Sequence, residues 1–351
     1  MLGTLGLAAA GLASAFAISE SIVWWFFPTE YLYPRYQVSP QYGLIPYPNV
    51  AMVHGVPRRF ELRYSTNADR CRGENVAPAG EAQRPAVAVL GDSYTFGMGV
   101  SDGEDYPAVM RRALGGRWTV LSLASPGWGL TQQIRRYYDL GEAYYPDVVV
   151  IQFGGNDPED NIINPVTKVR DGEFVFVDGG HGLNWTKRLL ARSVLQRSQL
   201  YNFARVRASR LLEAQRVKSG IEDQRRTMPG LVGSVTTRDS VRTMQERIYT
   251  DLLSTFAREL SADGRTLVVI AINRHLTLFP HIEAVVRDLD AQGLLRYHEV
   301  LDWLEGMSDY GSPDPGHGWG APAHAVIGER LAEVVLRIDE ERRTPGGALS
   351  P

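Results

Sequence analysis

The chain has little cysteine and little net charge. Its single cysteine, Cys71, excludes an internal disulfide framework and any metal cluster built from cysteines. The formal net charge of −3 over 351 residues lacks the basic surplus of proteins that bind polyanions, so we expect no nucleic-acid partner. The apolar and charged fractions are those of an ordinary globular protein. The chain is long enough to bury one large core with an inserted subdomain.

Charge is also absent from the amino terminus. Residues 2–17 are uncharged, and a second apolar run over 22–27 follows an interruption at Glu20. A membrane-spanning helix needs about 20 apolar residues, which this segment supplies only as a whole. Its paired tryptophans and phenylalanines suit the aromatic belt at a bilayer surface. We therefore expect residues 1–28 to form an uncleaved anchor that contacts membrane lipid.

Two other interpretations of this segment stay open, a signal peptide cleaved after Ala17 and a buried helix. The missing positively charged start argues against a signal peptide, and it also removes the usual signal for orientation. An anchored protein would place its catalytic domain outside the cytoplasm, whereas a cleaved one would be secreted or periplasmic.

The rest of the chain divides into three parts. Residues 29–84 form an arm rich in Tyr, Pro and Gly, and its first part, 29–57, is predicted to be extended and to lead away from the membrane. Within this arm, residues 60–66 alternate like a short strand. Residues 85–342 form the main domain, and residues 343–351 are expected to form a flexible tail.

The main domain alternates between strand and helix patterns. Short runs rich in Val, Leu and Ile predict strands over 86–91, 118–123, 147–153, 265–271 and 296–301. Amphipathic patterns predict helices over 103–114, 129–143, 240–262, 280–291 and 322–340. Buried strands separated by helices predict an α/β fold with a parallel sheet covered on both faces.

This alternation is interrupted by an insertion over 158–240. Residues 166–177 predict a hairpin, because Asp171 and Gly172 lie at its centre. Residues 185–218 predict a helix with many basic side chains and one acid, Glu213. Its basic side chains could form an ordinary solvated face, or a patch for anionic headgroups or an anionic glycan.

A candidate nucleophile, Ser93, follows the first predicted strand of the main domain in a Gly-Asp-Ser turn. Open α/β sheets place their sites at this carboxyl edge. A serine hydroxyl becomes a good nucleophile when a histidine takes its proton and a carboxylate orients that histidine. His317 and Asp314 have suitable spacing, because three residues of separation let both come from one loop.

The loops after the next two strands carry candidate donors for an oxyanion. Acyl transfer needs such donors aimed at the developing negative charge. We expect the backbone N–H of Gly127, the side-chain amide of Asn156 and the backbone N–H of Ser93 to converge on one edge of the sheet. The other interpretations are a plain turn glycine for Gly127 and a helix cap for Asn156.

Taken together, these blocks resemble those of the SGNH hydrolase superfamily, the GDSL-type lipases and esterases. The blocks contain Ser93, Gly127, Asn156, Asp314 and His317 in the family's order, and the resemblance covers roughly residues 85–340. It implies a three-layer α/β/α, flavodoxin-like fold, a Ser-His-Asp triad and no cofactor or metal. The apolar segment followed by a Tyr- and Pro-rich arm is similar to membrane-anchored bacterial members.

We therefore expect a serine esterase that hydrolyses O-acyl esters, acetyl or short acyl, on a small molecule or glycan. One alternative is an O-acyltransferase that passes the same acyl group to a hydroxyl of a cell-envelope glycan or another acceptor. Another is a non-catalytic envelope protein that keeps the fold and only binds. The remaining histidines do not suggest a metal site, because they fall in no metal-ligand spacing with one another.

Overall fold

The computed structural model describes residues 2–74, 85–178, 193–227 and 238–344. Most of the predicted tail at 343–351 lies outside these ranges, and so does the first part of the predicted basic helix, 185–192.

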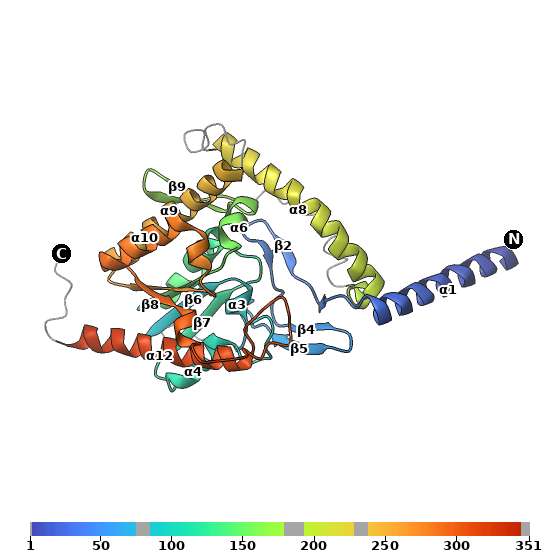
Figure 1. The fold of residues 1–351 in the computed structure, drawn as a ribbon, viewed down its shortest axis with the longest axis horizontal. Coiled ribbons are helices and arrows are strands. Elements are labelled where there is room, and N and C mark those ends of the chain that lie inside the picture. Colours follow the sequence, from blue (N-terminus) through green and yellow to red (C-terminus); the bar gives the residue numbers. More distant parts are fainter. Residues whose placement is uncertain (1, 75–84, 179–192, 228–237, 345–351) are drawn as a thin grey trace.

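The centre of the fold is a five-stranded sheet in which every neighbouring pair of strands is parallel (Figure 1). In chain order its strands are β6 (Ala86–Gly91), β7 (Thr119–Ala124), β8 (Val148–Phe153), β11 (Thr266–Ala271) and β12 (Arg296–Glu299). They lie in the order β12-β11-β8-β6-β7, which is the flavodoxin-like order. The predicted α/β fold with a parallel sheet is thus confirmed. The order reverses between β6 and β8, and ligands bind at such switch points.

Helices cover both faces of this sheet, as Figure 1 shows. One face packs against α4 (Tyr106–Ala113) and α12 (Ala321–Arg343). The other packs against α5 (Leu130–Asp139), α9 (Arg238–Ala262) and α10 (Pro280–Ala291). Each helix lies within three residues of its predicted start and within four of its predicted end.

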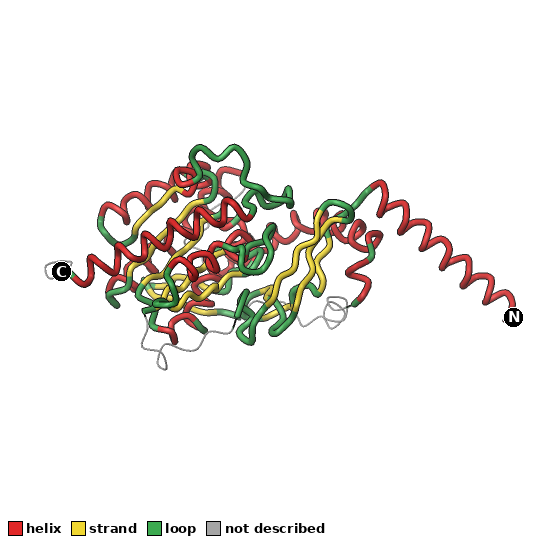
Figure 2. Tube along the Cα trace, turned by 90° about the horizontal axis from the view of Figure 1, so that it is seen from below, coloured by secondary structure: helices red, strands yellow, loops and turns green. Residues whose placement is uncertain are grey.

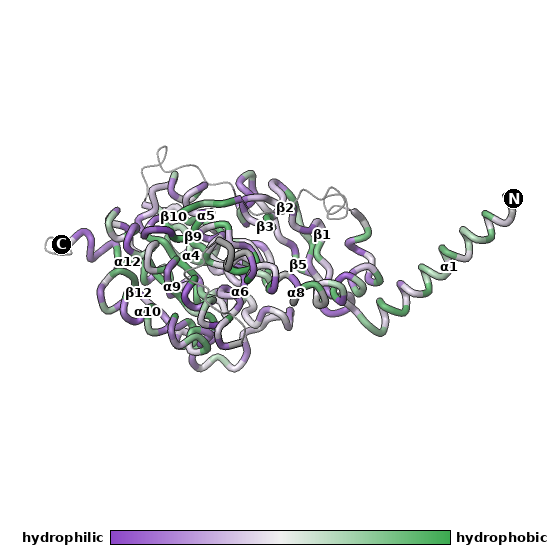
Figure 3. The backbone as a smooth tube through the Cα atoms, turned by 90° about the horizontal axis from the view of Figure 1, so that it is seen from above, coloured by the Kyte–Doolittle hydropathy of each residue, from purple (hydrophilic) through white to green (hydrophobic). Residues whose placement is uncertain are grey.

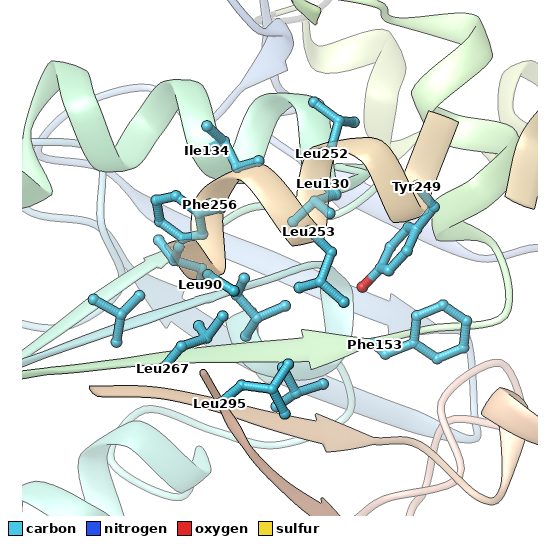
Figure 4. Packing of buried hydrophobic residues seen from close by; sticks show 14 of the residues in the cluster. Leu90, Leu130, Ile134, Phe153, Tyr249, Leu252, Leu253, Phe256, Leu267 and Leu295 are labelled. Carbon is cyan, nitrogen blue, oxygen red and sulfur yellow. The ribbon is translucent and has the colours of Figure 1, made fainter. Parts of the chain in front are cut away.

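Strands β6, β7, β8 and β11 are mostly apolar because successive side chains enter opposite layers of the core, whereas the edge strand β12 is polar and only partly buried. In β6, Val87 and Val89 pack with the layer of α4 and α12. Ala88 and Leu90 pack with the layer of α5, α9 and α10. Figure 4 shows this second layer, in which Leu90 of the sheet lies beneath Phe256 of α9.

One predicted strand ends early. The sequence predicts a strand over 296–301, but β12 stops at Glu299 and the short helix α11 (Val300–Trp303) follows. The Glu299 side chain accepts a hydrogen bond from the Leu301 amide at 3.2 Å and so caps this helix. The apolar residues at 300 and 301 suit either element, and the cap decides between them.

The arm is not extended, so that prediction is wrong. Strands β1 (Tyr31–Tyr33), β4 (Ala51–Val56) and β5 (Phe60–Ser65) form a small antiparallel sheet, and β2 (Gln37–Ser39) pairs with β3 (Gly43–Ile45). Figure 2 shows the longer strands of this arm between the main domain and the amino-terminal helix. The arm folds back because its strands bury apolar side chains, which are Leu32, Ile45, Met52, Val56 and Tyr64.

The small sheet packs directly on the main domain. Met52 and Tyr64 are buried in one apolar cluster with Phe96 and Met98, which follow the end of β6. The arm therefore contributes a wall beside the carboxyl edge of the main sheet.

The amino-terminal helix α1 (Leu2–Phe26) projects away from the rest of the molecule (Figure 1). Its stretch Thr4–Phe26 has a mean hydropathy of 1.5 and is long and apolar enough to cross a membrane. Figure 3 shows that apolar residues dominate it along most of its length. Such a helix suits a membrane anchor or a signal sequence.

The carboxyl-terminal part of α1 contacts the body of the protein. Glu20 accepts hydrogen bonds from the Ser198 hydroxyl (2.7 Å) and from the backbone amides of Gln199 (2.6 Å) and Leu200 (3.0 Å). These groups open helix α8 (Gln199–Thr227), where free amides and the helix dipole favour a carboxylate. The one acid of α1 is therefore satisfied at a helix N-terminus.

The arm also reaches the end of α1. Arg58, at the tip of the β4–β5 hairpin, donates to the carbonyl oxygens of Trp24 (3.3 Å) and Trp25 (2.7 Å). Its guanidinium lies over both indole rings, 5.1 and 4.7 Å from their centroids. This contact caps the last turn of α1 and fixes the hairpin against it.

The insertion holds the predicted hairpin, which is confirmed. Strands β9 (Thr167–Arg170) and β10 (Glu173–Phe176) pair antiparallel. Asp171 and Gly172 both have positive φ, 52° and 83°, as a type I′ turn requires. The predicted basic helix is confirmed from Gln199 onward, where α8 begins. Over the described residues before it the prediction is wrong, because Val194–Arg197 form a separate 3-10 helix, η2, that ends at an extended Ser198.

Candidate active site

Ser93 opens the four-residue helix α3 (Ser93–Phe96), directly after β6. Asp92 caps this helix, because its side chain accepts a hydrogen bond from the Tyr94 amide at 2.9 Å. A Cβ at Gly91 would clash with the side chain of Thr95, so only glycine fits where the strand turns into the helix. This turn leaves Ser93 half-buried at the carboxyl edge of the sheet.

Asp314 and His317 meet within the loop before α12. His317 Nδ1 lies 2.7 Å from Asp314 Oδ2, and the Gly316 amide donates to Asp314 Oδ1 at 2.9 Å. Burial alone would raise the pKa of Asp314, but the hydrogen bonds from His317 and Gly316 outweigh it and hold that pKa below its usual value. Asp314 is thus an ionised acceptor that can orient the imidazole.

The imidazole of His317 lies beside the nucleophile helix. Its ring centroid is 5.5 Å from that of Tyr94, the residue after Ser93, and the Gly318 amide donates to the Tyr94 hydroxyl at 3.4 Å. Within the described residues, Ser93 Oγ makes no hydrogen bond to His317. Hydrolases without substrate often hold this contact long and close it in the complex.

Gly127 lies in a tight turn after β7. The Trp128 amide donates to the Ser125 carbonyl at 3.3 Å, and Gly127 has a φ of 75° at the position where a type II turn needs glycine. Gly127 is exposed, and no described residue accepts its amide hydrogen. The turn explains the glycine, and the free N–H lies at the same edge of the sheet as Ser93.

Asn156 follows β8 at the start of α6 (Asp157–Ile163). Its side chain makes no capping hydrogen bond to that helix. Instead Nδ2 donates to Asp160 Oδ2 at 2.8 Å, and the residue is exposed. The Asn156 side chain also hydrogen-bonds the carboxylate of Asp92, so its amide would have to share or exchange one of these two bonds to donate to an oxyanion.

Two buried carboxylates, Asp92 and Asp157, lie beneath these loops. Burial raises the pKa of Asp92, and burial together with the nearby charge of Asp92 raises the pKa of Asp157 further. Gln152 links the ends of β6 and β8 when its amide is oriented to satisfy both of its partners. In that orientation its nitrogen donates to Asp92 Oδ1 (2.7 Å) and its oxygen accepts from the Gly154 amide (3.2 Å). Both carboxylates are therefore easier to protonate than exposed ones.

The comparison with known families decides the class of the protein. The GDSL-like lipase/acylhydrolase family matches residues 89–294, which is more than half of the chain. The chain belongs to this family. It is accordingly a serine hydrolase that acts on ester bonds.

Several solved structures resemble this GDSL-like hydrolase. A G-D-S-L family protein from Desulfitobacterium hafniense DCB-2 is 10% identical, with a TM-score of 0.41 over 72% of this chain and 99% of the other. The psychrotrophic esterase EstA from Pseudoalteromonas sp. is 11% identical, with a TM-score of 0.40 over 73% and 98%. The acetyl xylan esterase Est2A from Butyrivibrio proteoclasticus is 12% identical, with a TM-score of 0.38 over 76% and 66%. The search of curated proteins finds no match.

Some residues around the site of this hydrolase were not expected from the sequence. His275 Nδ1 accepts the Gly155 amide hydrogen at 3.1 Å, beside Asn156. Burial lowers the pKa of His275, which keeps its imidazole neutral and able to accept. The sequence marks Gln152 as unusual, because it is a polar residue in an otherwise apolar strand, but nothing in the sequence places His275 near the site.

The histidine near the carboxyl terminus, His324, has a packing role. It is fully buried, stacks on the ring of Tyr106 and accepts the Tyr106 amide at 3.1 Å. Across the described part of the chain, no three His, Cys, Asp or Glu side chains are arranged to hold a metal ion.

Proposed function

We propose that the protein is a membrane-anchored serine esterase that removes short O-acyl groups, such as acetyl, from a small molecule or glycan outside the cytoplasm. The observation that carries this proposal is the hydrogen bond of 2.7 Å between His317 and Asp314, beside the helix that begins with Ser93. Membership of the family supports the cleavage of esters, and the catalytic roles of Ser93, Asp314 and His317 are part of the proposal.

In this mechanism Ser93 Oγ attacks the acyl carbonyl carbon while His317 takes the hydroxyl proton. The tetrahedral oxyanion accepts hydrogen bonds from the N–H groups of Ser93, Gly127 and Asn156. When the C–O bond to the alcohol breaks, His317 gives its proton to the leaving oxygen. Water then attacks the acyl-enzyme by the same steps, which releases the acid and restores Ser93.

A product assay tests this proposal. The purified full-length protein is incubated with p-nitrophenyl acetate and with an acetylated glycan, each with and without a sugar acceptor. Free acetate in both conditions supports an esterase. Transfer of the acetyl group to the sugar in preference to water would make the protein an acyltransferase instead.

We expect Asn156→Ala to lower kcat by about 10²–10³ with a modest change in KM, because one oxyanion donor contributes this much in related chemistry. Steady-state kinetics on p-nitrophenyl acetate measures both constants. Asn156→Asp is the matched variant, since it keeps the size of the side chain and loses the N–H donors, and it should be equally impaired. A kcat within about twofold of wild type would show that Asn156 has only a structural role.

We expect the full-length protein to stay with membranes during carbonate and high-salt washing, because the stretch Thr4–Phe26 of α1 is long and apolar enough to cross a membrane. Release by salt alone would contradict an integral anchor. Amino-terminal sequencing of the mature protein checks the other interpretation, since a chain that begins at Ile18 would have lost a signal peptide.

A further inference from the structure

The arm lies outside the segment that matches the family, yet it contacts the loop of Gly127 and the helix of Ser93 with the residues that follow it. Trp128, next to Gly127, donates through Nε1 to the Leu44 carbonyl at 2.7 Å and stacks on Tyr42. A second contact is made by two buried residues of the arm, Arg72 and Tyr64, with the helix of Ser93 and the residues that follow it as far as Gly99 and Val100.

Arg72 holds the carboxyl-terminal end of the nucleophile helix. Its side chain is only 1% exposed. It donates to the carbonyl oxygens of Phe96 (2.7 Å), Gly97 (2.5 Å) and Val100 (2.7 Å). A helix of four residues has little stability of its own, so these bonds to its last carbonyls help to keep α3 in place. The Arg72 guanidinium lies 4.6 Å from the ring centroid of Tyr64, which extends the same support.

Tyr64 starts a chain of hydrogen bonds that runs through the arm. Its hydroxyl lies 2.6 Å from His54 Nδ1, and His54 Nε2 lies 2.8 Å from Glu30 Oε1. The amide of Gly99 donates to the Tyr64 oxygen at 3.3 Å. Tyr64 and His54 are both fully buried, whereas the Glu30 side chain is 53% exposed.

The groups at the two ends of this chain of hydrogen bonds determine which atom donates in each bond. Gly99 can only donate, and the carboxylate of Glu30 can only accept. The hydrogen bond from His54 lowers the pKa of Glu30, which keeps it ionised at neutral pH. The arrangement that uses every proton has Tyr64 donating to His54 Nδ1 and His54 Nε2–H donating to Glu30.

Gly99 lies between Tyr64 and the loop that carries His317, the proposed base. It has a φ of 97°, and a Cβ built at this position would lie 3.3 Å from Ser312 Oγ and 3.5 Å from His317 Cβ. The backbone of Gly99 thus faces the His317 loop across a space that a single added carbon would fill, and its amide is hydrogen-bonded to Tyr64. It also follows Gly97, which ends the helix of Ser93.

We propose that Tyr64, His54 and Glu30 are positioning residues that set the His317 loop against the Ser93 helix through the backbone of Gly99. This inference rests on the proposed roles of Ser93 and His317. The three residues contact no substrate in this scheme, so they should affect turnover and not the binding of a small ester.

Tyr64→Phe in the full-length protein tests the proposal. It keeps the ring in the core and removes the hydroxyl that joins His54 to Gly99. We expect kcat to fall by about tenfold or more with KM within about twofold, because small misplacements of catalytic groups cost this much. Labelling by a fluorophosphonate should slow by a similar factor. Hydrogen exchange should become faster in peptides that cover 93–100 and 312–320.

Tyr31→Phe is the matched control. Tyr31 lies in the same small sheet and gives its hydroxyl proton to Glu61 at 3.0 Å, away from Gly99. It should leave kcat, labelling and exchange unchanged. Equal effects of the two variants would overturn the proposal, because they would show a general loss of stability in the arm.

Glu30 provides a second test that does not disturb the core. Glu30→Gln keeps an acceptor for His54 and should stay close to wild type, whereas Glu30→Leu should resemble Tyr64→Phe. A Glu30→Leu enzyme that changes only in KM would point to substrate contact and overturn the positioning role.

The exchange measurement separates this inference from the proposed function. If the wild-type protein cleaves no ester and takes up no fluorophosphonate, the proposed function fails. Faster exchange over 312–320 in Tyr64→Phe alone would still support the link between arm and loop, and unchanged exchange would overturn it.

Discussion

Replacing Ser93 with alanine should abolish hydrolysis of p-nitrophenyl acetate and labelling by a fluorophosphonate. The loss of kcat should be of the order of 10⁶, as found when a serine nucleophile is removed from other hydrolases. The fold should remain intact, because Ser93 is half-buried and its hydroxyl makes no hydrogen bond within the described residues. Circular dichroism and thermal unfolding check the fold, and gel fluorescence after labelling checks the site.

Ser101→Ala provides the comparison for this result. Ser101 lies in the loop after the nucleophile helix, and only its backbone takes part in hydrogen bonds, with Glu104. It should be labelled and should turn over like wild type. Labelling of Ser93→Ala at the wild-type rate would remove Ser93 as the nucleophile and leave the site unassigned.

Changing Asp314 to asparagine should lower kcat by about 10⁴, because an amide at this position favours the wrong tautomer of the imidazole. The residue should still fit, since Gly316 can keep its hydrogen bond to the side-chain oxygen. Asp309→Asn is the matched control, because Asp309 accepts the Gly311 amide in the same loop and is exposed. It should keep full activity.

The pH dependence of the wild-type enzyme adds a second measurement on this pair. The lowered pKa of Asp314 means that its carboxylate stays ionised as the pH falls through the range in which a histidine titrates. Activity should therefore rise with pH through a single ionisation, because only a neutral His317 can accept the proton of Ser93. A flat profile, or Asp314→Asn at full rate, would contradict the proposed triad.

Much of the main domain could be predicted because its signals are local. Five predicted strands are present and pair in parallel, and the ends of β6, β7 and β8 bring the loops of Ser93, Gly127 and Asn156 to one edge. The spacing of Asp314 and His317 anticipated a contact within one loop, and the structure has it. Their roles in catalysis stay predictions.

Within the arm, the strand predicted at 60–66 is confirmed as β5 (Phe60–Ser65), but the rest could not be predicted because its signals are not local. Its strands β1, β2 and β3 have three residues each, too few to show a period. His54 lies 24 positions from its partner Glu30 in the sequence. Arg72 lies 24 to 28 positions from the carbonyl groups that it binds, those of Phe96, Gly97 and Val100. The residues around His54 and Arg72 give no sign that such partners exist. The composition of the arm therefore predicted an extended segment, whereas the arm packs on the main domain.

The contact of Arg58 with the end of α1 fixes the distance between that helix and the catalytic edge of the sheet. The tryptophans that Arg58 covers suit the bilayer surface, and the strand of six residues that leads from the hairpin tip toward Tyr64 is about 20 Å long at about 3.3 Å per residue. If α1 spans the membrane, the hairpin acts as a ruler that holds the catalytic edge at one height. Esters carried on long chains that extend from the surface would then come within reach, and those held flat at the level of the lipid headgroups would stay below it.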